Sequence, residues 1–223
     1  MKVTVVIPTK NEEHTLPEVI ERVRPYADEI LVVDGHSTDR TREVAEAAGV
    51  RVILDNKKGK GAALRHVINF VKTEITVFID ADGSHDPEDI PKLIYPILKG
   101  EADHVAGSRL TGGSSELHGG FDEFFRLAGS SFITAMINWR FKVRLSESQN
   151  GFRAIKTDVM KQLDLQENIT TIEQEMTMRT LKKGFRMAEV PSHEHTRKMG
   201  YSKISVKKVA FRYVYTLFKY LFF

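Results

Sequence analysis

Short apolar runs alternate with amphipathic segments along the first half of the chain. The runs rich in Val, Ile and Leu predict strands at 2–7, 29–33, 51–54 and 77–82, and a further short strand around Val105. Apolar positions at helical spacing predict helices at 15–24, 39–48, 61–71 and 87–98. Strands and helices that alternate with short connections are typical of βαβ units. We therefore expect an α/β fold with a mostly parallel sheet flanked by helices.

The second half of the chain continues with longer polar segments. A Gly/Ser-rich loop at 111–120 precedes an apolar segment at 121–139, which is too short to span a bilayer and is expected to form a helix over the sheet. The expected order is then a polar loop at 146–153, helices at 157–163 and 171–183, a strand at 185–191 and a basic loop at 193–203. We expect one catalytic domain over 1–203 and a separate C-terminal helix over 204–223.

Two carboxylates follow the most apolar of these runs. Asp80 and Asp82 come directly after Val77, Phe78 and Ile79. In open α/β sheets ligands bind beyond the carboxyl ends of the strands. Two like charges placed so close together are costly unless a cation compensates them, and a hard divalent ion that also binds phosphate oxygens would do so. The alternative is a solvated turn, because Asp82-Gly83 is also a turn signal.

Charge is distributed unevenly along the chain. Seven of the 33 basic residues follow Glu194, so positions 1–194 carry 26 basic residues and all 30 acidic residues, a net charge of −4. Apolar residues make up 41% and charged residues 28%, as in ordinary globular proteins. The absence of cysteine excludes disulfides and thiolate chemistry. Since no apolar leader precedes the first strand, we expect no signal peptide and a cytoplasmic location.

The C-terminal helix is expected to be basic and amphipathic. Its predicted apolar face consists of Val206, Val209, Ala210, Tyr213, Val214, Leu217 and Leu221, and its polar face of Ser205, Lys208, Arg212 and Lys219. Lys and Arg within the run disfavour a spanning helix, and a helix lying in the interface of the cytoplasmic face of a membrane fits better. The alternatives are packing onto the domain's own core or a homodimer contact.

Several charged residues lie in loops expected at the same sheet edge. Asp34 ends the second strand, and Arg109, Arg197 and Lys203 are cations in later loops. Together with Asp80 and Asp82 they favour a nucleotide-diphosphate site. A P-loop is excluded because Gly59-Lys60-Gly61 lacks the required spacing and hydroxyl. A dinucleotide site is excluded because no Gly-x-Gly-x-x-Gly follows the first strand.

The order of these motifs resembles the GT-A, family 2 inverting glycosyltransferases, and within them the polyprenyl-phosphate (dolichol-phosphate) mannosyl- and glucosyltransferases. The matching motifs are Ile7-Pro8-Thr9-Lys10-Asn11-Glu12, Val33-Asp34-Gly35-His36-Ser37-Thr38-Asp39, Lys60-Gly61-Ala62-Ala63, Asp80-Ala81-Asp82-Gly83-Ser84-His85-Asp86-Pro87, Gly107-Ser108-Arg109, Ser148-Gln149-Asn150-Gly151-Phe152, and Glu189-Val190-Pro191 through Arg197 to Gly200-Tyr201-Ser202-Lys203. The match extends from about residue 3 to 205, and the ordered set is far more specific than any single motif.

The resemblance implies a role for each matching residue. Asp80 and Asp82 would bind Mg²⁺ or Mn²⁺ with the diphosphate, and Arg109, Arg197 and Lys203 would hold phosphates, making Asp82 and these three cations the catalytic set. The nucleotide-sugar site would be formed by Pro8, Thr9, Glu12, Asp34, Gly35, Asp80 and Gln149. This sequence departs from the family pattern at two places, which affects the roles assigned to Gln149 and to the metal site. Glu147 and Ser148 stand where the family has an acidic residue before Gln149, and Ser84 replaces a common Gln.

The implied reaction moves a hexose from GDP-mannose or UDP-glucose to a polyprenyl or dolichyl phosphate, without a side-chain nucleophile. A phosphate monoester has a second pKa of about 6 and arrives already ionised. The alternative is transfer to a sugar or protein hydroxyl with Glu173 or Glu175 as base. Those two residues would otherwise complement a helix dipole. A second alternative, a non-catalytic nucleotide- or nucleic-acid-binding module, is supported only by the basic tail, and we expect no nucleic acid partner.

Overall fold

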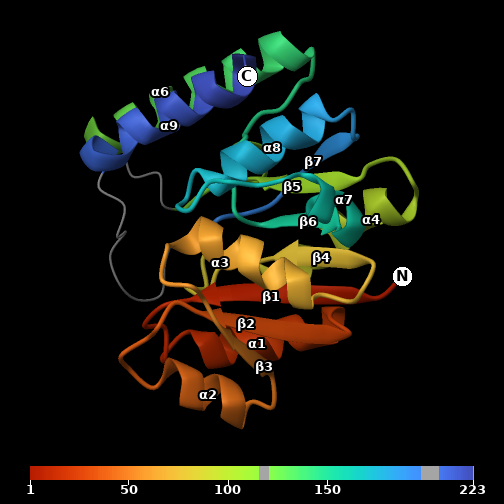
Figure 1. Cartoon of the computed structure of the whole chain (residues 1–223), viewed down its shortest axis with the longest axis vertical. Coiled ribbons are helices and arrows are strands. Elements are labelled where there is room, and N and C mark those ends of the chain that lie inside the picture. The colour runs from red at the N-terminus through yellow and green to blue at the C-terminus, as the bar shows by residue number, and fades with distance from the viewer. Residues whose placement is uncertain (116–120, 197–205, 223) are drawn as a thin grey trace.

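The computed structural model describes residues 1–115, 121–196 and 206–222, and the strands of these residues form one twisted sheet between helices (Figure 1). The strands are β1 Val3–Thr9, β2 Glu29–Asp34, β3 Arg51–Leu54, β4 Ile75–Phe78, β5 His104–Ser108, β6 Arg153–Lys156 and β7 Met187–Pro191. Their order in the sheet is β3-β2-β1-β4-β6-β5-β7. The mostly parallel α/β sheet expected from the alternating pattern is confirmed.

Strand β6 is the exception to the parallel arrangement. It runs antiparallel to both β4 and β5, which it separates. The polar loop expected at 146–153 overlaps β6 only at Arg153, and the sequence predicts no strand at 154–156. Its four residues, Arg-Ala-Ile-Lys, are too few and too mixed in polarity to show a strand pattern. Arg153 nevertheless lies fully buried within the sheet.

Helices cover both faces of the sheet because successive side chains of the central strands point to opposite sides. Val5 and Ile7 pack into one core with helices α1 Leu16–Val23, α2 Thr41–Ala47 and α4 Ile90–Leu98. Val6 packs into a second core with α3 Lys60–Val67, α7 Thr157–Gln162 and α8 Ile172–Lys182. Shorter helical segments are η1 Arg24–Tyr26, η2 Ile68–Phe70, η3 Pro87–Asp89 and α5 Arg109–Gly112.

Two long helices form an outer layer beyond α8. Helices α6 Phe121–Phe141 and α9 Val206–Phe222 lie side by side at the top of Figure 1. They enclose a third core with α8, which contains Ile133, Ile137, Met178, Leu217, Tyr220 and Leu221. The expectation that α6 lies over the sheet is wrong, because its apolar side packs against α8 and α9 instead.

The predicted apolar face of α9 is divided between the core and the surface. Tyr213, Leu217 and Leu221 face the third core, as expected for packing onto the domain, whereas Val214 is exposed. The outer side is rich in aromatic residues: Phe211, Tyr215, Phe218 and Phe222 are all exposed. Among the described residues, no helix combines the length and the apolar character needed to cross a bilayer.

Candidate active site

The candidate site lies at the edge of the sheet where the parallel strands end. Strands β1, β2, β4 and β5 all present their carboxyl ends there, which brings the loops after them together. Because β6 is antiparallel to β4, the loop that precedes it reaches the same edge. Loop 146–152 therefore lies at the candidate site because β6 is antiparallel; before a parallel strand, the same loop would lie at the opposite edge of the sheet.

Asp80 lies at the centre of an ionic chain. Lys60, at the start of α3, places its Nζ 2.6 Å from Asp80 and 3.0 Å from the carboxylate of Glu173, at the start of α8. Burial alone would lower the pKa of Lys60, but Asp80 and Glu173 outweigh it and raise the pKa above its ordinary value. The ammonium therefore stays charged and neutralises part of the carboxylate cluster.

Gly151 approaches this ionic chain closely. A Cβ at Gly151 would lie 3.1 Å from both Asp80 Oδ2 and Lys60 Nζ. Any side chain at this position would therefore crowd the carboxylate and the ammonium. The Gly-Phe pair of loop 146–152 thus keeps the space beside Asp80 open.

Asp82 is oriented by Ser84. The backbone amide and hydroxyl of Ser84 donate to Asp82 Oδ1 at 3.1 and 2.6 Å. His85 is buried next to them, stacked on Phe152 at 5.1 Å with its Nε2 3.9 Å from Asp80 Oδ2. Burial lowers the pKa of His85, so its imidazole is neutral at pH 7. Ser84, which replaces the common Gln, therefore acts on Asp82 through a hydrogen bond.

The donor set at Asp80 and Asp82 fits a hard divalent cation. Carboxylate oxygens are the ligands that Mg²⁺ and Mn²⁺ prefer, and Mg²⁺ commonly takes one or two carboxylates with substrate phosphates. Lys60 already shows that a positive charge is stable beside Asp80. The described residues contain no group of three or more acidic, His or Cys side chains arranged as a metal site by themselves. A cation there would need oxygen ligands from the substrate.

The residues expected to contact the nucleoside come together at the ends of β1 and β2. Pro8 pairs with Val33 and Thr9 with Asp34, and the amide of Gly35 donates to the Thr9 carbonyl at 2.8 Å. Asp34 is fully buried, and its carboxylate accepts hydrogen bonds from the amide and hydroxyl of Ser37. The turn after β2 thereby fixes the orientation of the Asp34 carboxylate.

Glu12 lies close to these residues. The Glu12 amide donates to the Thr41 hydroxyl at 2.9 Å, and its carboxylate accepts from Thr15 at 3.1 Å. These bonds tie the loop after β1 to the starts of α1 and α2. Pro8, Thr9, Asp34 and Gly35 thus form one patch, with Glu12 in the loop that follows Thr9, and their contact with a nucleoside remains a prediction.

Arg109 is enclosed by two carboxylates. Its guanidinium lies 2.6 Å from Glu147 and 2.8 Å from Glu194, and both partners are buried. Burial would lower the pKa of Arg109, yet these two carboxylates raise it. Burial raises the pKa of Glu147, whereas Arg109 and Ser114 outweigh burial at Glu194 and hold its pKa below the usual value. Any phosphate bound by Arg109 would have to share or displace one carboxylate.

The remaining expected site residues are placed differently. Arg197 and Lys203 lie outside the described residues. Glu175 is fully buried; its carboxylate accepts from the amides of Gln166 and Glu167 and pairs with Arg179 at 2.8 Å. Both oxygens of Glu175 are thus bonded, to the turn before α8 and to Arg179, and its role as a base in the alternative reaction stays a prediction.

Some buried polar atoms near the site have no hydrogen-bond partner among the described residues. They include Glu173 Oε2 and Gln149 Nε2. Buried polar atoms are normally satisfied, and those that are not often indicate a ligand or a catalytic role. Glu173 thus remains available to the site through one oxygen, while its other oxygen contacts Lys60.

Four site residues were not assigned a role from the sequence. Lys60 and His85 lie within matching motifs, and Glu147 occupies the position before Ser148-Gln149 where an acidic residue is expected, so each carried a signal. Glu194 carried none. Its segment pairs with His85 and Ser114 through isolated bridges, a contact that no local pattern indicates.

A mostly parallel sheet whose edge carries a carboxylate pair after β4 and a buried Asp at the end of β2 defines the GT-A class of nucleotide-sugar-binding folds. The family model for glycosyl transferase family 2 matches residues 4–163, and the chain belongs to this family. The resemblance noted from the ordered motifs is thereby confirmed.

Curated relatives include proteins that act on lipid phosphates. An undecaprenyl-phosphate mannosyltransferase from Micrococcus luteus is 32% identical over 92% of this chain and 88% of its own length. A dolichyl-phosphate hexose transferase from Haloferax volcanii is 29% identical over 84% of this chain and 80% of its own length. The glycosyltransferase AglJ from the same organism is 30% identical over 89% of this chain, which spans 64% of AglJ.

Among solved structures, glucosyl-3-phosphoglycerate synthase from Mycobacterium tuberculosis, in complex with Mn²⁺, UDP and phosphoglyceric acid, has a TM-score of 0.77 with this chain. The alignment covers 99% of this chain and 78% of the synthase at 22% identity. At that identity the likeness establishes the fold, and the GT-A architecture expected from the sequence is confirmed.

Proposed function

We propose that this chain transfers a hexose, with inversion, from GDP-mannose or UDP-glucose to a polyprenyl or dolichyl phosphate. The observation that carries the proposal is the placement of Asp80 and Asp82 at the sheet edge, beside the Asp34 patch and the ammonium of Lys60. That arrangement suits a nucleoside on one side and a diphosphate on the other. The lipid-phosphate acceptor is supported by the relatives from Micrococcus luteus and Haloferax volcanii.

Asp80 and Asp82 would hold the Mg²⁺ or Mn²⁺ ion, which when bound neutralises charge on the diphosphate. Around it, the described residues orient rather than react. Ser84 fixes Asp82 through two hydrogen bonds, and Lys60 holds Asp80 against Glu173. Neutral His85, packed on Phe152, lies 3.9 Å from Asp80 and limits how far this carboxylate can move. In this proposal the protein contributes position and charge to the transition state.

The bond changes need no side-chain nucleophile. An oxygen of the acceptor phosphate attacks the anomeric carbon, and the bond from that carbon to the donor diphosphate breaks. The electron pair leaves on the diphosphate. Because the acceptor has a second pKa of about 6, it is already ionised at neutral pH and no proton has to be removed. Arg109, Arg197 and Lys203 are proposed to hold the phosphates.

A membrane surface is the proposed location of the acceptor. The outer side of α9 exposes Phe211, Tyr215, Phe218 and Phe222, and no acidic residue follows Glu194. An aromatic face with basic neighbours suits the interface of a membrane on its cytoplasmic side. The alternative use of this face is a homodimer contact.

The first test is sugar transfer from a panel of GDP- and UDP-sugars to a short-chain polyprenyl phosphate, with Mg²⁺ or Mn²⁺ and with EDTA. We expect a sugar-phospholipid with one donor, and loss of the product with EDTA. In Asp82→Asn we expect the rate to fall by about two to three orders of magnitude, as when one group that stabilises developing charge is removed.

Asp158→Asn is the matched control for Asp82→Asn, because Asp158 is an exposed carboxylate on α7 and should leave the rate unchanged. A metal-independent product, or equal rates for Asp82→Asn and wild type, would contradict the proposal. Sugar transfer in any form would exclude a non-catalytic nucleotide- or nucleic-acid-binding module.

The second candidate function is transfer to a sugar or protein hydroxyl, favoured by the unpartnered oxygen of Glu173. A base at that position would be worth about 10²–10⁴-fold in rate. With an ionised phosphate acceptor, Glu173→Gln should reduce kcat by less than about tenfold and leave its pH profile unchanged. A larger loss, together with a pH limb that disappears in the variant, would identify Glu173 as a base and favour the hydroxyl acceptor.

A further inference from the structure

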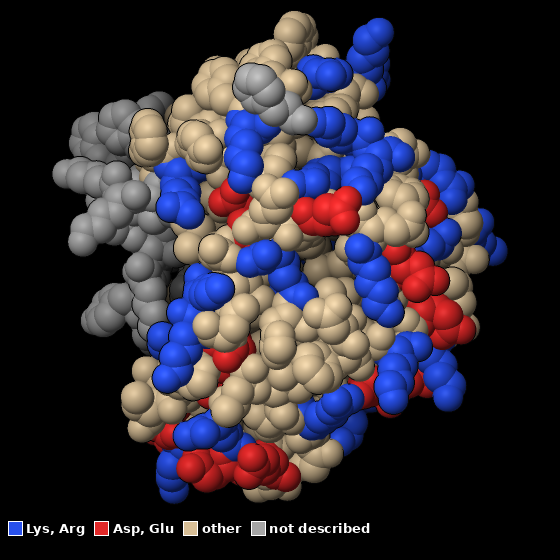
Figure 2. Space-filling view, in the orientation of Figure 1, with Lys and Arg blue, Asp and Glu red and all other residues tan. Residues whose placement is uncertain are grey.

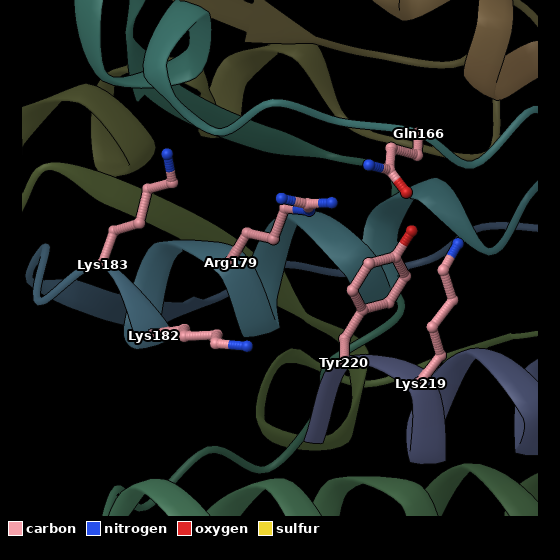
Figure 3. A pocket seen from close by; sticks show the side chains of 6 residues that line it. All are labelled: Gln166, Arg179, Lys182, Lys183, Lys219 and Tyr220. Carbon is pink, nitrogen blue, oxygen red and sulfur yellow. The ribbon is translucent and has the colours of Figure 1, made fainter. Parts of the chain in front are cut away.

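A basic pocket lies between α8 and α9, built by residues other than those assigned to the candidate active site. It has a volume of about 470 Å³. Its lining comes from the turn before α8 and from both helices: Gln166, Arg179, Lys182, Lys183, Lys219 and Tyr220 (Figure 3). Arg179 and Lys182 extend from α8 and Lys183 from the residue after it, while Lys219 and Tyr220 extend from α9. The pocket therefore lies between α8, which covers the sheet, and α9 of the outer layer.

Carboxylates hold the cations of this pocket from its inner side. Arg179 pairs with Glu175 at 2.8 Å, and Lys219 pairs with Glu167 at 3.2 Å. Both carboxylates are buried, whereas Lys182 and Lys183 are exposed. Lys183 also contacts Asp164 at 2.6 Å. The lining residues thus include four cations and no carboxylate. Two of the three carboxylates that pair with them, Glu175 and Glu167, are buried behind the lining, so the open side of the pocket is positive.

Tyr220 gives the pocket a rigid wall. Its ring lies 4.9 Å from the Arg179 guanidinium and 4.6 Å from Lys219 Nζ, and its hydroxyl donates to Glu167 at 3.2 Å. The ring and the carboxylates fix the guanidinium in place before any ligand binds. A planar guanidinium with lysines around it is suited to phosphate oxygens.

The surroundings of the pocket indicate where such a phosphate comes from. Phe218 and Phe222, the neighbours of Lys219 and Tyr220 on α9, are exposed and stack on one another at 6.1 Å. Neither 124–146, which includes most of α6, nor 195–223 contains an acidic residue. Figure 2 shows more Lys and Arg than Asp and Glu over the upper part of this face. Exposed aromatic residues beside a positive pocket match the chemistry of an anionic phospholipid surface.

We propose that this pocket binds the phosphate headgroup of an anionic phospholipid while the aromatic side of α9 enters the interface. Binding here seats the protein on the membrane in a fixed orientation, separately from acceptor binding at the sheet edge. The inference rests on the membrane location given in the proposed function, but it does not depend on the reaction. Its test therefore measures binding without sugar transfer.

The test is co-sedimentation of the full chain with phosphatidylcholine vesicles that contain or lack phosphatidylglycerol. Lys182→Gln/Lys219→Gln removes two cations from the pocket and should weaken binding to the anionic vesicles by about 30-fold, or about fivefold for each charge. Lys182→Arg/Lys219→Arg keeps the charges and should bind like the wild type. Lys72→Gln/Lys99→Gln makes the same change in net charge at exposed lysines outside the pocket, and should lose less than about threefold.

Two further measurements separate a loss of headgroup binding from misfolding and from a failed reaction. Thermal unfolding of each variant shows whether it is folded, and Lys182→Gln alone, at an exposed position, provides a milder change with about a fivefold effect. Transfer to a soluble short-chain acceptor should be equal in the pocket variants and the wild type, so a failed reaction is separable from failed vesicle binding.

Three results would overturn the inference. The first is equal loss of binding in the pocket and control doubles, which would indicate attraction by net charge. The second is wild-type vesicle binding by Lys182→Gln/Lys219→Gln. The third is saturable binding of inorganic phosphate to the pocket with no preference for anionic vesicles, which would assign it to a free anion.

Discussion

Arg153 is a fully buried cation that links the site to the sheet. Its guanidinium donates to the carbonyl of Asn150 and, at 3.1 Å, to that of Glu173. Burial lowers the pKa of Arg153 to about 10, so the group remains charged at neutral pH. One side chain thus connects loop 146–152 to the start of α8, the two segments that contribute Gly151 and Glu173 to the site.

His104 contacts the guanidinium of Arg153, and this contact determines the tautomer of His104 and adds to the effect of burial in lowering its pKa. Arg153 Nη1 is 3.4 Å from His104 Nε2, and because a guanidinium can only donate, Nε2 must accept. The proton is therefore on Nδ1, which lies 2.8 Å from the Thr180 hydroxyl. Burial and the charge of Arg153 lower the pKa of His104 well below its usual value.

This arrangement predicts a loss of stability in mild acid. The unfolded chain binds a proton at His104 below about pH 6.5, whereas the folded protein does not. The contribution of His104 to the free energy of unfolding is therefore fully present above that pH. As the pH drops below it, the free energy of unfolding should fall by about 1.4 kcal/mol per pH unit. Urea unfolding at a series of pH values measures the slope.

The variant His104→Gln removes the titration while keeping an acceptor for Arg153. It should be less stable than the wild type at pH 7.5 but show a shallower slope below pH 6.5. Buried His85 also has a lowered pKa, so part of the slope should persist. A slope identical to that of the wild type would show that His104 is protonated in the folded protein.

At the scale of elements, α3 depends on a close contact at Gly61. A Cβ at this position would lie 2.5 Å from the carbonyl oxygen of Glu167 and 2.7 Å from that of Ile169. The amide of Ala62 donates to the Asn168 carbonyl at 3.2 Å, so this loop packs directly on the first turn of the helix. Lys60 precedes Gly61, and any shift of the helix moves its ammonium.

Gly61→Ala should therefore lower the free energy of unfolding by about 1–3 kcal/mol, the usual cost of overpacking. It should also reduce kcat, because Lys60 would move away from Asp80. Gly129→Ala is the matched control, since a Cβ there meets nothing within 4 Å and alanine stabilises a helix by about 1 kcal/mol. Thermal unfolding and initial rates measure both effects. A fully active and stable Gly61→Ala would contradict the packing argument.

Sequence predicted the elements where a local pattern exists. Helices α1 to α4 and strands β1 to β3 fall close to their expected positions because apolar periodicity encodes both. Strand β6 lacked a pattern, since its burial comes from neighbours on both sides and not from its own composition. The same limit applies to the site.

Asp34, Asp80 and Asp82 could be placed at one edge because strand direction alone fixes where the ends of strands lie. Their partners could not. The pairs Lys60–Glu173 and Arg109–Glu194 join segments that are distant in sequence. The first pair forms only when α8 is in place, and the second only when the segment after β7 is in place. A charged residue in a loop at the sheet edge indicates a functional site, but only the three-dimensional structure shows which residue of opposite charge pairs with it.

At the scale of the whole molecule, one side of α9 packs into a core of the domain and the other side is exposed to solvent. Leu217 and Leu221 complete the third core with α6 and α8, while Phe211 is 79% exposed on the outer side. An amphipathic surface helix is therefore held in place before it meets any partner. The residue range 204–223 given for a separate C-terminal unit remains a prediction, although its described part packs on α6 and α8.

The position of β6 has a consequence for how the molecule is made. Strands β1 to β4 pair among themselves, but β5 pairs with β6 and β7, both of which follow it in the chain. At about 5–20 residues per second, β6 is synthesised about 2–10 s after β5. Limited proteolysis of ribosome-bound nascent chains should show protection of β1 to β4 before β6 is synthesised, and protection that begins only with β6 would exclude this order. We therefore expect the half that carries Asp34, Asp80 and Asp82 to fold first, with its carboxylates in position before Arg109, Glu147 and Glu194 can join them.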